Sequence, residues 1–190
     1  ILVVGRATGG LAIAAVITCI FWGAISGSGP ATAAALGLVF IPTMIKQGYD
    51  KYFSASAIAA GAGLSIIIPP SIAFIVYGNL TDVSVGALFL GGIVPGVIVG
   101  IFLILSVYLS SKRHNFRGEI QRGSLKEIGK AFIGAFWSLL APVIILGSIY
   151  AGIATPTESA IMGVFYALFV GLFVYKTINF KLLISALSDT

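Results

Sequence analysis

The sequence predicts an all-α membrane protein, in which transmembrane helices are combined with one re-entrant helical hairpin and one helix broken at a double proline. Hydrophobic residues make up 58% of the 190 residues and charged residues 9%, and the mean hydropathy is +1.10, unlike a soluble domain. Several apolar runs approach or exceed the roughly 20 residues that a helix needs to cross a bilayer. Turn-forming residues interrupt two apolar regions, with the sequence SGSGP at 26–30 and PPS at 69–71.

Residues 1–52 are interpreted as the re-entrant hairpin. Its two apolar arms, 11–25 and 31–45, are joined by a tip at 26–30. With a rise of 1.5 Å per residue, each arm is about 22 Å long, which is shorter than a hydrocarbon core of about 30 Å. A hairpin that enters and leaves on the same side of the membrane therefore fits better than two full spans.

A helix broken by prolines is expected at 53–78. Pro69 and Pro70 lack an N–H group, and their rings disrupt the preceding turn. Gly92, Gly96 and Gly100 recur every four residues and predict a face for close helix packing. Three transmembrane helices are expected at 86–110, 131–154 and 155–175. The basic loop at 111–130 joins the first two, and residues 176–190 begin a further segment.

The basic residues favour one orientation in the membrane. Six of the eleven Lys and Arg lie between Lys112 and Lys130. If this loop is cytoplasmic, the predicted spans place all eleven on the same side, as the positive-inside rule requires. Two full spans in place of the hairpin would give the same sides, so charge does not distinguish them. The net charge of +5 thus reflects topology, and nucleic-acid binding is not expected.

The two interruptions carry the groups that can bind an ion within the membrane. The tip offers the hydroxyls of Ser26 and Ser28 and unpaired backbone groups, while the double proline frees carbonyls around 64–68. Hydroxyl and carbonyl oxygens suit a small hard cation, and the N–H groups from Pro30 onward suit a carboxylate. The alternatives are a plain Gly-Ser turn and a kink accommodated by neighbouring helices.

The remaining polar residues indicate no catalytic site. Thr155 and Glu158 flank Pro156 in the pattern of a helix N-terminal capping box, which is their expected role. Only six acidic residues are present, with no pair inside a span, no cluster of metal ligands and no pairing of nucleophile and base. The protein is therefore not expected to be an enzyme or to bind an organic cofactor.

Several runs, taken in order, resemble one family: GAISGSGPATAAALG, IPTMIKQGYDKYFSASAIAA, SIIIPPSIAFIVYG and LAPVIILGSIYAGIATPTESA. They look like the large membrane subunit of TRAP transporters, the tripartite ATP-independent periplasmic transporters of the DctM type. The resemblance implies half of an inverted-repeat, elevator-type secondary transporter in the bacterial or archaeal cytoplasmic (inner) membrane. Such a transporter imports organic acids, such as C4-dicarboxylates or sialic acid, with a sodium gradient as the driving force.

The resemblance also implies the partners and the site. The partners are a small membrane subunit, a periplasmic substrate-binding protein, the remaining half of the large subunit and membrane lipid. The chain is expected to be a segment of a longer protein and not to transport alone. Sodium would be the only metal, bound by Ser26, Gly27, Ser28, Gly29, Ile68, Pro69, Pro70 and Ser71. Substrate would be bound nearby by Ser28, Pro30, Thr32 and Ser71.

Thr32 stands where many family members carry an aspartate, so any role of that acid is absent or supplied differently. Two other classes of protein stay open on the residues alone. One is a channel whose re-entrant loop lines a pore. The other is a structural membrane subunit built from a kinked bundle.

Overall fold

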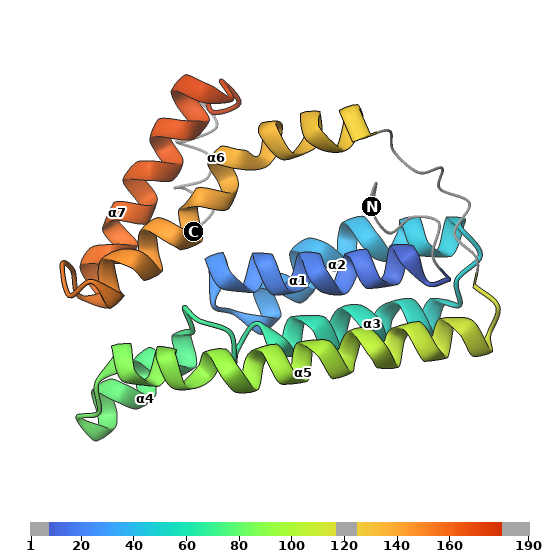
Figure 1. Cartoon of the computed structure of the whole chain (residues 1–190), viewed down its shortest axis with the longest axis horizontal. Helices are drawn as coiled ribbons and strands as arrows, with labels where there is room; N and C mark the ends of the chain where they lie inside the picture. Colours follow the sequence, from blue (N-terminus) through green and yellow to red (C-terminus); the bar gives the residue numbers. More distant parts are fainter. Residues whose placement is uncertain (1–7, 117–124, 180–190) are drawn as a thin grey trace. The chain divides into compact units, whose positions relative to one another are not determined.

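The computed structural model describes residues 8–116 and 125–179, and every element in this part is a helix (Figure 1). The chain divides into two compact units, Ile1–Lys130 and Ala131–Thr190. The predicted all-α membrane class is confirmed, because four helices in the described part are long and apolar enough to cross a membrane. They are Gly29–Lys46, Val85–Arg113, Glu127–Tyr150 and Pro156–Val174.

The predicted hairpin region contains α1 (Gly10–Ser26) and α2 (Gly29–Lys46), which are joined by only two residues. α1 ends because Gly27 adopts a left-handed conformation with φ of 61° and donates its N–H to the Gly23 carbonyl. The Ser28 hydroxyl then accepts a hydrogen bond from the Ala31 N–H and caps α2. The arms are thus longer than predicted, because Gly29 and Pro30 belong to the first turn of α2 rather than to the tip.

The region predicted as one broken helix contains two helices, α3 (Lys51–Leu64) and α4 (Ile72–Thr81). Asp50 caps α3, since its Oδ1 accepts hydrogen bonds from the Tyr52 and Phe53 N–H groups at 2.9 Å. Residues 65–71 connect the two helices and include a cis peptide bond between Pro69 and Pro70. We call residues 65–71 the connecting segment. α5 (Val85–Arg113) follows as a continuous helix.

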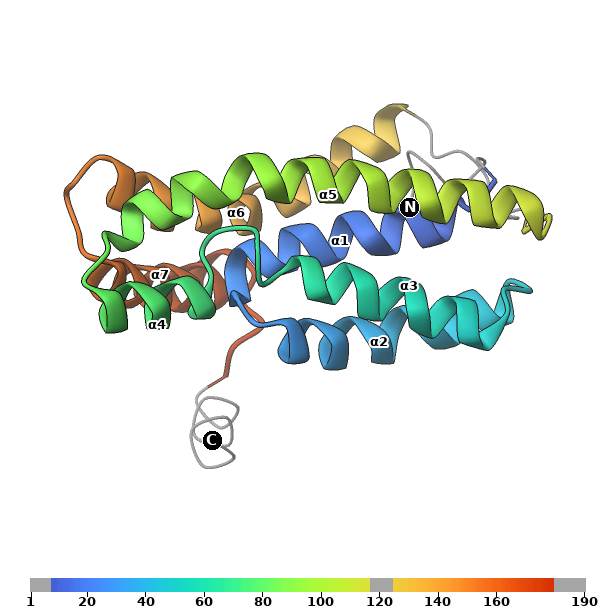
Figure 2. The same ribbon diagram turned by 90° about the horizontal axis from the view of Figure 1, so that it is seen from below.

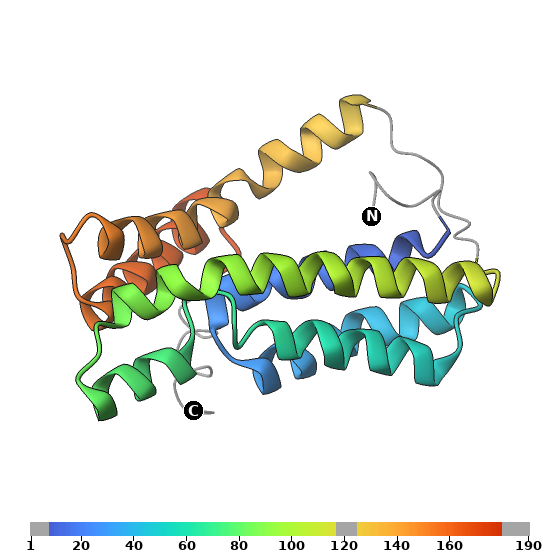
Figure 3. The ribbon, with the colours of Figure 1, turned by 60° about the horizontal axis from the view of Figure 1, so that its bottom comes forward.

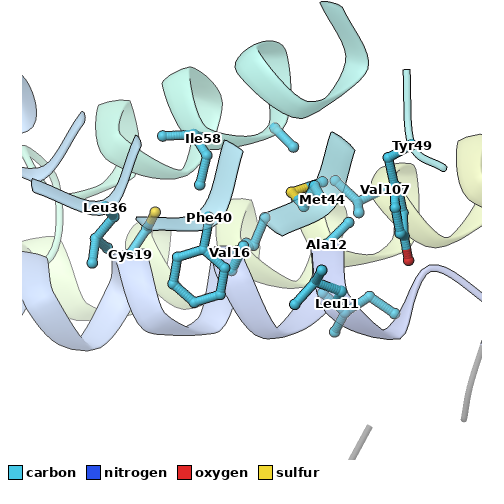
Figure 4. Close-up of a cluster of buried hydrophobic side chains, with 13 residues drawn as sticks. Leu11, Ala12, Val16, Cys19, Leu36, Phe40, Met44, Tyr49, Ile58 and Val107 are labelled. Carbon is cyan, nitrogen blue, oxygen red and sulfur yellow. The ribbon is translucent and has the colours of Figure 1, made fainter. Parts of the chain in front are cut away.

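α1 lies at the centre of the first unit and packs against α2, α3 and α5. Its first two turns are almost entirely buried, and its small residues allow close approach of the surrounding helices. Figure 4 shows this core, in which side chains from the four helices and from the α2–α3 turn meet. Among its members are Leu11, Val16, Cys19, Leu36, Phe40, Met44, Tyr49, Ile58 and Val107.

The second unit contains most of α6 (Leu125–Tyr150), together with α7 (Pro156–Phe169) and a π-helical turn, η1 (Val170–Val174). Thr155 is the N-cap of α7, and the Glu158 carboxylate reaches back to the Thr155 N–H at 2.7 Å, so the two residues form a capping box. The Ser148 and Ser159 hydroxyls lie 2.7 Å apart and join α6 to α7.

The observed bounds of two predicted segments differ from the predicted ones. The basic loop predicted at 111–130 is shorter, because α5 continues to Arg113 and α6 begins at Leu125, so Lys112 and Lys130 lie on helices. Of the loop proper, His114–Phe116 are described and 117–124 lie outside the described residues. In the predicted final segment, Lys176–Asn179 are described and not helical, and 180–190 lie outside, as do residues 1–7 of the predicted hairpin region.

Candidate functional site

The turn between α1 and α2 gathers three neutral oxygen atoms. The Thr32 hydroxyl donates a hydrogen bond to the Ser28 carbonyl at 2.8 Å and lies 3.2 Å from the Ser26 hydroxyl. The Ser26 hydroxyl also lies 3.4 Å from the same carbonyl. Thr32 is fully buried. The three oxygens are therefore held in place by one another, through residues of α1, α2 and the turn between them. Hydroxyls and a carbonyl at a helix terminus are ligands of the kind that alkali cations use in interrupted helices.

The connecting segment is organised by two buried serines. The Ser71 hydroxyl donates to the Ile66 carbonyl at 2.6 Å and accepts from the Phe74 N–H at 3.4 Å, so it closes the loop and caps α4. The Ser65 hydroxyl donates to the Cys19 carbonyl on α1 at 3.3 Å. Both side chains are fully buried. The segment is therefore tied to itself at one end and to the first hairpin arm at the other.

The turn of the hairpin touches the connecting segment directly, and Figure 2 shows the two side by side. The Ile72 N–H donates to the Gly27 carbonyl at 3.3 Å. A Cβ atom at position 27 would lie 2.7 Å from the Pro70 carbonyl oxygen, and one at position 29 would lie 3.1 Å from the Ala62 carbonyl oxygen. Glycine is thus needed here for two reasons, the left-handed backbone of Gly27 and the close approach of the two chain segments.

The other side of the connecting segment rests on α5, which runs along both α3 and α4 (Figure 3). A Cβ atom at Gly92 would lie 2.7 Å from the Ile67 carbonyl oxygen, and one at Gly96 would lie 2.8 Å from the Ile68 side chain. A Cβ atom at Gly100 would lie 3.3 Å from the Leu64 side chain at the end of α3. The four-residue glycine spacing predicted a packing face. What the sequence did not reveal is that this face receives the non-helical backbone beside the hairpin turn.

The sequence-predicted site residues do not all lie together. Ser26, Gly27 and Ser28 lie in the turn, and Gly27 contacts the Pro70–Ile72 backbone. The Ile68 side chain lies against α5 instead. Of the predicted substrate residues, Ser28 is half-buried and Pro30 exposed, whereas Thr32 and Ser71 are buried and use their hydroxyls internally. Thr155 and Glu158 belong to the second unit.

The junction between the turn and the connecting segment carries no formal charge. The polar groups named above are hydroxyls and backbone amides, and the described residues contain no group of three or more His, Cys, Asp or Glu side chains that could hold a metal ion. Such a donor set does not suit zinc or calcium, which are bound by thiolates, imidazoles or several carboxylates. It fits a monovalent hard cation, which can be bound by neutral oxygens alone.

Membrane-length helices and two helix interruptions that meet are typical of the membrane domains of secondary transporters. The comparison with protein families agrees with this class. The family model for the DctM component of the tripartite ATP-independent periplasmic transporters matches residues 1–190. The chain belongs to this family of membrane transporter components.

Individual relatives support the assignment. The isethionate TRAP transporter permease DctMQ of Oleidesulfovibrio alaskensis is 47% identical over 92% of this chain and 28% of its own length. The C4-dicarboxylate large permease DctM of Vibrio cholerae is 47% identical over 93% of this chain and 39% of its own length. The sialic acid large permease SiaM of the same organism is 36% identical over 98% of this chain and 44% of its own length. The chain therefore spans less than half the length of these relatives.

Proposed function

We propose that this chain supplies an ion-binding hairpin and a broken helix to a sodium-coupled importer of organic acids. The hairpin is formed by α1 and α2, and we propose that it enters the membrane from one side without crossing it, although α2 is by length and composition also a candidate span. The broken helix is formed by α3 and α4. The observation that carries the proposal is the contact between the two interruptions, where the Gly27 carbonyl accepts the Ile72 N–H beside the oxygen cluster of Ser26, Ser28 and Thr32.

Sodium binding at this junction is supported by the chemistry of its oxygens. The α1 C-terminus directs carbonyls and the negative end of its dipole toward the turn, and the serine and threonine hydroxyls add further neutral ligands. Hydrogen bonds between these oxygens hold them within 2.8–3.4 Å of one another. A sodium ion bound among them would stabilise the contact between turn and connecting segment, and thus the conformation that accepts substrate.

An organic anion fits the other side of the turn. The N-terminal end of α2, which begins at Gly29, presents the positive end of the helix dipole, which favours a carboxylate or sulfonate. Relatives of this chain are named for isethionate, C4-dicarboxylates and sialic acid, all of which are acids. We assign the same class of substrate to the complete protein. Sodium and substrate bound at adjacent positions would strengthen one another's binding reciprocally.

The complete transporter requires further parts. Because relatives are more than twice as long as the matched segment, the rest of the large subunit supplies a second half of the site. A small membrane subunit and a periplasmic binding protein complete the tripartite system named in the family description. The basic residues between α5 and α6 favour a cytoplasmic position for that connection, by the positive-inside rule. Movement of the hairpin unit as an elevator would expose the site alternately to the two sides of the membrane.

Replacing Ser28 with leucine is expected to abolish sodium-dependent uptake while leaving membrane insertion intact. The substitution removes the N-cap of α2 and places a bulky apolar side chain among the oxygens of the turn. Uptake of labelled succinate, isethionate and sialic acid is measured in vesicles that contain the complete transporter, with sodium or potassium outside.

The matched control is Ala34→Leu, which adds the same bulk to an exposed position six residues, or nearly two turns, farther along α2. The control should retain uptake driven by sodium. The proposal would be contradicted if the Ser28 variant took up these acids as fast as the wild type. It would also be contradicted if uptake by the wild type were the same in sodium and in potassium.

A further inference from the structure

The first turn of α1 is a buried helix N-terminus without a side-chain cap. Leu11 and Ala12 are fully buried, and the N-cap residue is Gly9, which has no side chain that could accept a hydrogen bond. The N–H groups of residues 10–12 have no carbonyl partner within the helix, because the helical bonds begin with that from the Ile13 N–H to the Gly9 carbonyl. Buried amides without an acceptor are costly, so this turn requires an acceptor from outside the helix.

Two buried hydroxyl groups face this turn. The Tyr49 side chain is 3% exposed and extends from the α2–α3 turn, so that its oxygen lies beside the Leu11 and Ala12 amides (Figure 4). Ser111 on α5 is fully buried, and a Cβ atom at Gly9 would lie 2.5 Å from its Oγ. Neither hydroxyl forms a hydrogen bond of regular geometry with any residue that the structure describes.

Phe116, beyond the end of α5, fixes these groups relative to one another. Its carbonyl accepts a hydrogen bond from the Gly9 N–H at 3.0 Å, and its own N–H donates to the Ser111 carbonyl at 3.0 Å. Its ring packs on the ring of Tyr49, with the two centroids 5.0 Å apart. The start of α1 and the two hydroxyls are therefore held together by contacts that do not use the hydroxyls themselves.

The polar groups that meet at this turn are hydrogen-bond donors. Burial raises the pKa of Tyr49, and the Leu11 and Ala12 amides offset that rise only in part, so the phenol keeps its proton at neutral pH. Either hydroxyl could accept from an amide, but its own proton would then need an acceptor, and among residues 8–116 and 125–179 it has none. A water molecule would accept from two donors and add two protons of its own. An anion, in contrast, accepts from every donor.

We infer that the N-terminus of α1 binds a small monovalent anion, a halide or a simple carboxylate, through the amides of residues 10–12 and the hydroxyls of Tyr49 and Ser111. The positive end of the helix dipole favours such an ion. The turn between α1 and α2 lies at the other end of this helix of 17 residues, about 25 Å away, so the anion site is separate from the proposed sodium site.

Chloride and formate serve as the probes for this site. The intact protein that contains this chain is purified in potassium gluconate, whose bulky anion should not enter a buried site. Binding of radioactive chloride, competition by formate, and the melting temperature in each salt are then measured at equal ionic strength without sodium. The wild type should bind chloride or formate saturably and melt at a higher temperature in that salt. Tyr49→Phe and Ser111→Ala each remove one donor and should raise the anion's Kd about tenfold or more.

Melting in gluconate distinguishes a ligand site from hydroxyls that cap the helix themselves. Without the anion both hydroxyls are buried and unpartnered, so each variant should melt at or above the temperature of the wild type. Variants that melt below the wild type in gluconate and respond to chloride and formate as it does would overturn the inference. The matched controls Tyr52→Phe and Ser106→Ala make the same changes at exposed positions and should bind the anion as the wild type does.

The two probes also identify the class of ligand. A response to chloride alone would support a halide site, and a response to formate alone would support a carboxylate site. If the wild type neither bound chloride saturably nor melted differently in chloride, formate and gluconate, the inference would be overturned. Unchanged anion binding in both Tyr49→Phe and Ser111→Ala would overturn it as well. Because sodium is absent throughout, none of these results depends on the proposed sodium site.

Discussion

Replacing Gly27 with alanine is expected to destabilise the protein by about 2–4 kcal/mol and to abolish sodium-dependent uptake. Gly27 has a φ of 61°, and forcing a non-glycine residue into this left-handed conformation costs about 1 kcal/mol. The added Cβ atom would also lie 2.7 Å from the Pro70 carbonyl oxygen, so the turn and the connecting segment must separate, at a further cost of about 1–3 kcal/mol. Thermal melting of the purified protein and vesicle uptake measure the two effects.

Gly48 provides the matched control. It has a φ of 81° and no atom within 4 Å of the position where a Cβ would stand. Gly48→Ala therefore carries the backbone cost without the clash, about 1 kcal/mol, and uptake should persist. Equal melting temperatures for the two variants, with uptake retained in both, would show that the contact between Gly27 and the connecting segment is dispensable.

Replacing Gly96 with leucine is expected to lower stability by about 3 kcal/mol or more. The first added atom would lie 2.8 Å from the Ile68 side chain, and three further carbon atoms would force α5 away from the connecting segment. Overpacking of a closed contact typically costs 1–3 kcal/mol even for smaller additions. Because α5 supports the carbonyls beside the turn, the variant should also reduce the sodium-dependent gain in melting temperature.

Gly91→Leu is the control for this substitution. Gly91 is adjacent to the glycine face but is exposed, with no atom within 4 Å of its Cβ position. Leucine there should leave the melting temperature unchanged or slightly raised, since leucine has a higher helix propensity than glycine. If the Gly96 variant had the same melting temperature as the Gly91 variant, this result would contradict the close packing between α5 and the connecting segment.

The sequence contains clear signals for the elements and weak signals for their ends. Apolar run length predicts the span at 86–110, but the observed helix continues to Arg113, because Lys and Arg are good helix formers and can extend beyond the hydrocarbon region. The tip was expected at 26–30, yet Gly29 and Pro30 are helical. Proline is compatible with a first helical turn, so composition alone does not separate turn from helix start.

The contacts between distant segments could not be read from spacing. The sequence identifies the SGSGP turn and the double proline as separate interruptions. That Ser65 bonds to the Cys19 carbonyl, and that Ile72 bonds to Gly27, depends on how α1, α3 and α5 pack in three dimensions. The glycine spacing on α5 was visible, but its partner was not, since a small-residue face can receive a helix or non-helical backbone equally well.

The proposed sodium site at the hairpin turn depends on the hydroxyl of Thr32. This hydroxyl donates to the Ser28 carbonyl at 2.8 Å and lies 3.2 Å from the Ser26 hydroxyl. Thr43, about three turns farther along α2, forms the same kind of bond with the Val39 carbonyl at 2.7 Å, away from the turn. Valine at either position removes one hydroxyl and keeps the shape of the side chain, so the two variants form a matched pair.

The most direct measurement is therefore the melting temperature of the intact protein in sodium and in potassium at equal ionic strength. A ligand that binds only the folded state raises the melting temperature according to its concentration and affinity. If sodium binds at the turn, the melting temperature is expected to rise specifically in sodium for the wild type and for Thr43→Val, and clearly less for Thr32→Val. Identical melting in the two salts, or an equal rise in both variants, would contradict a sodium site at the turn between α1 and α2.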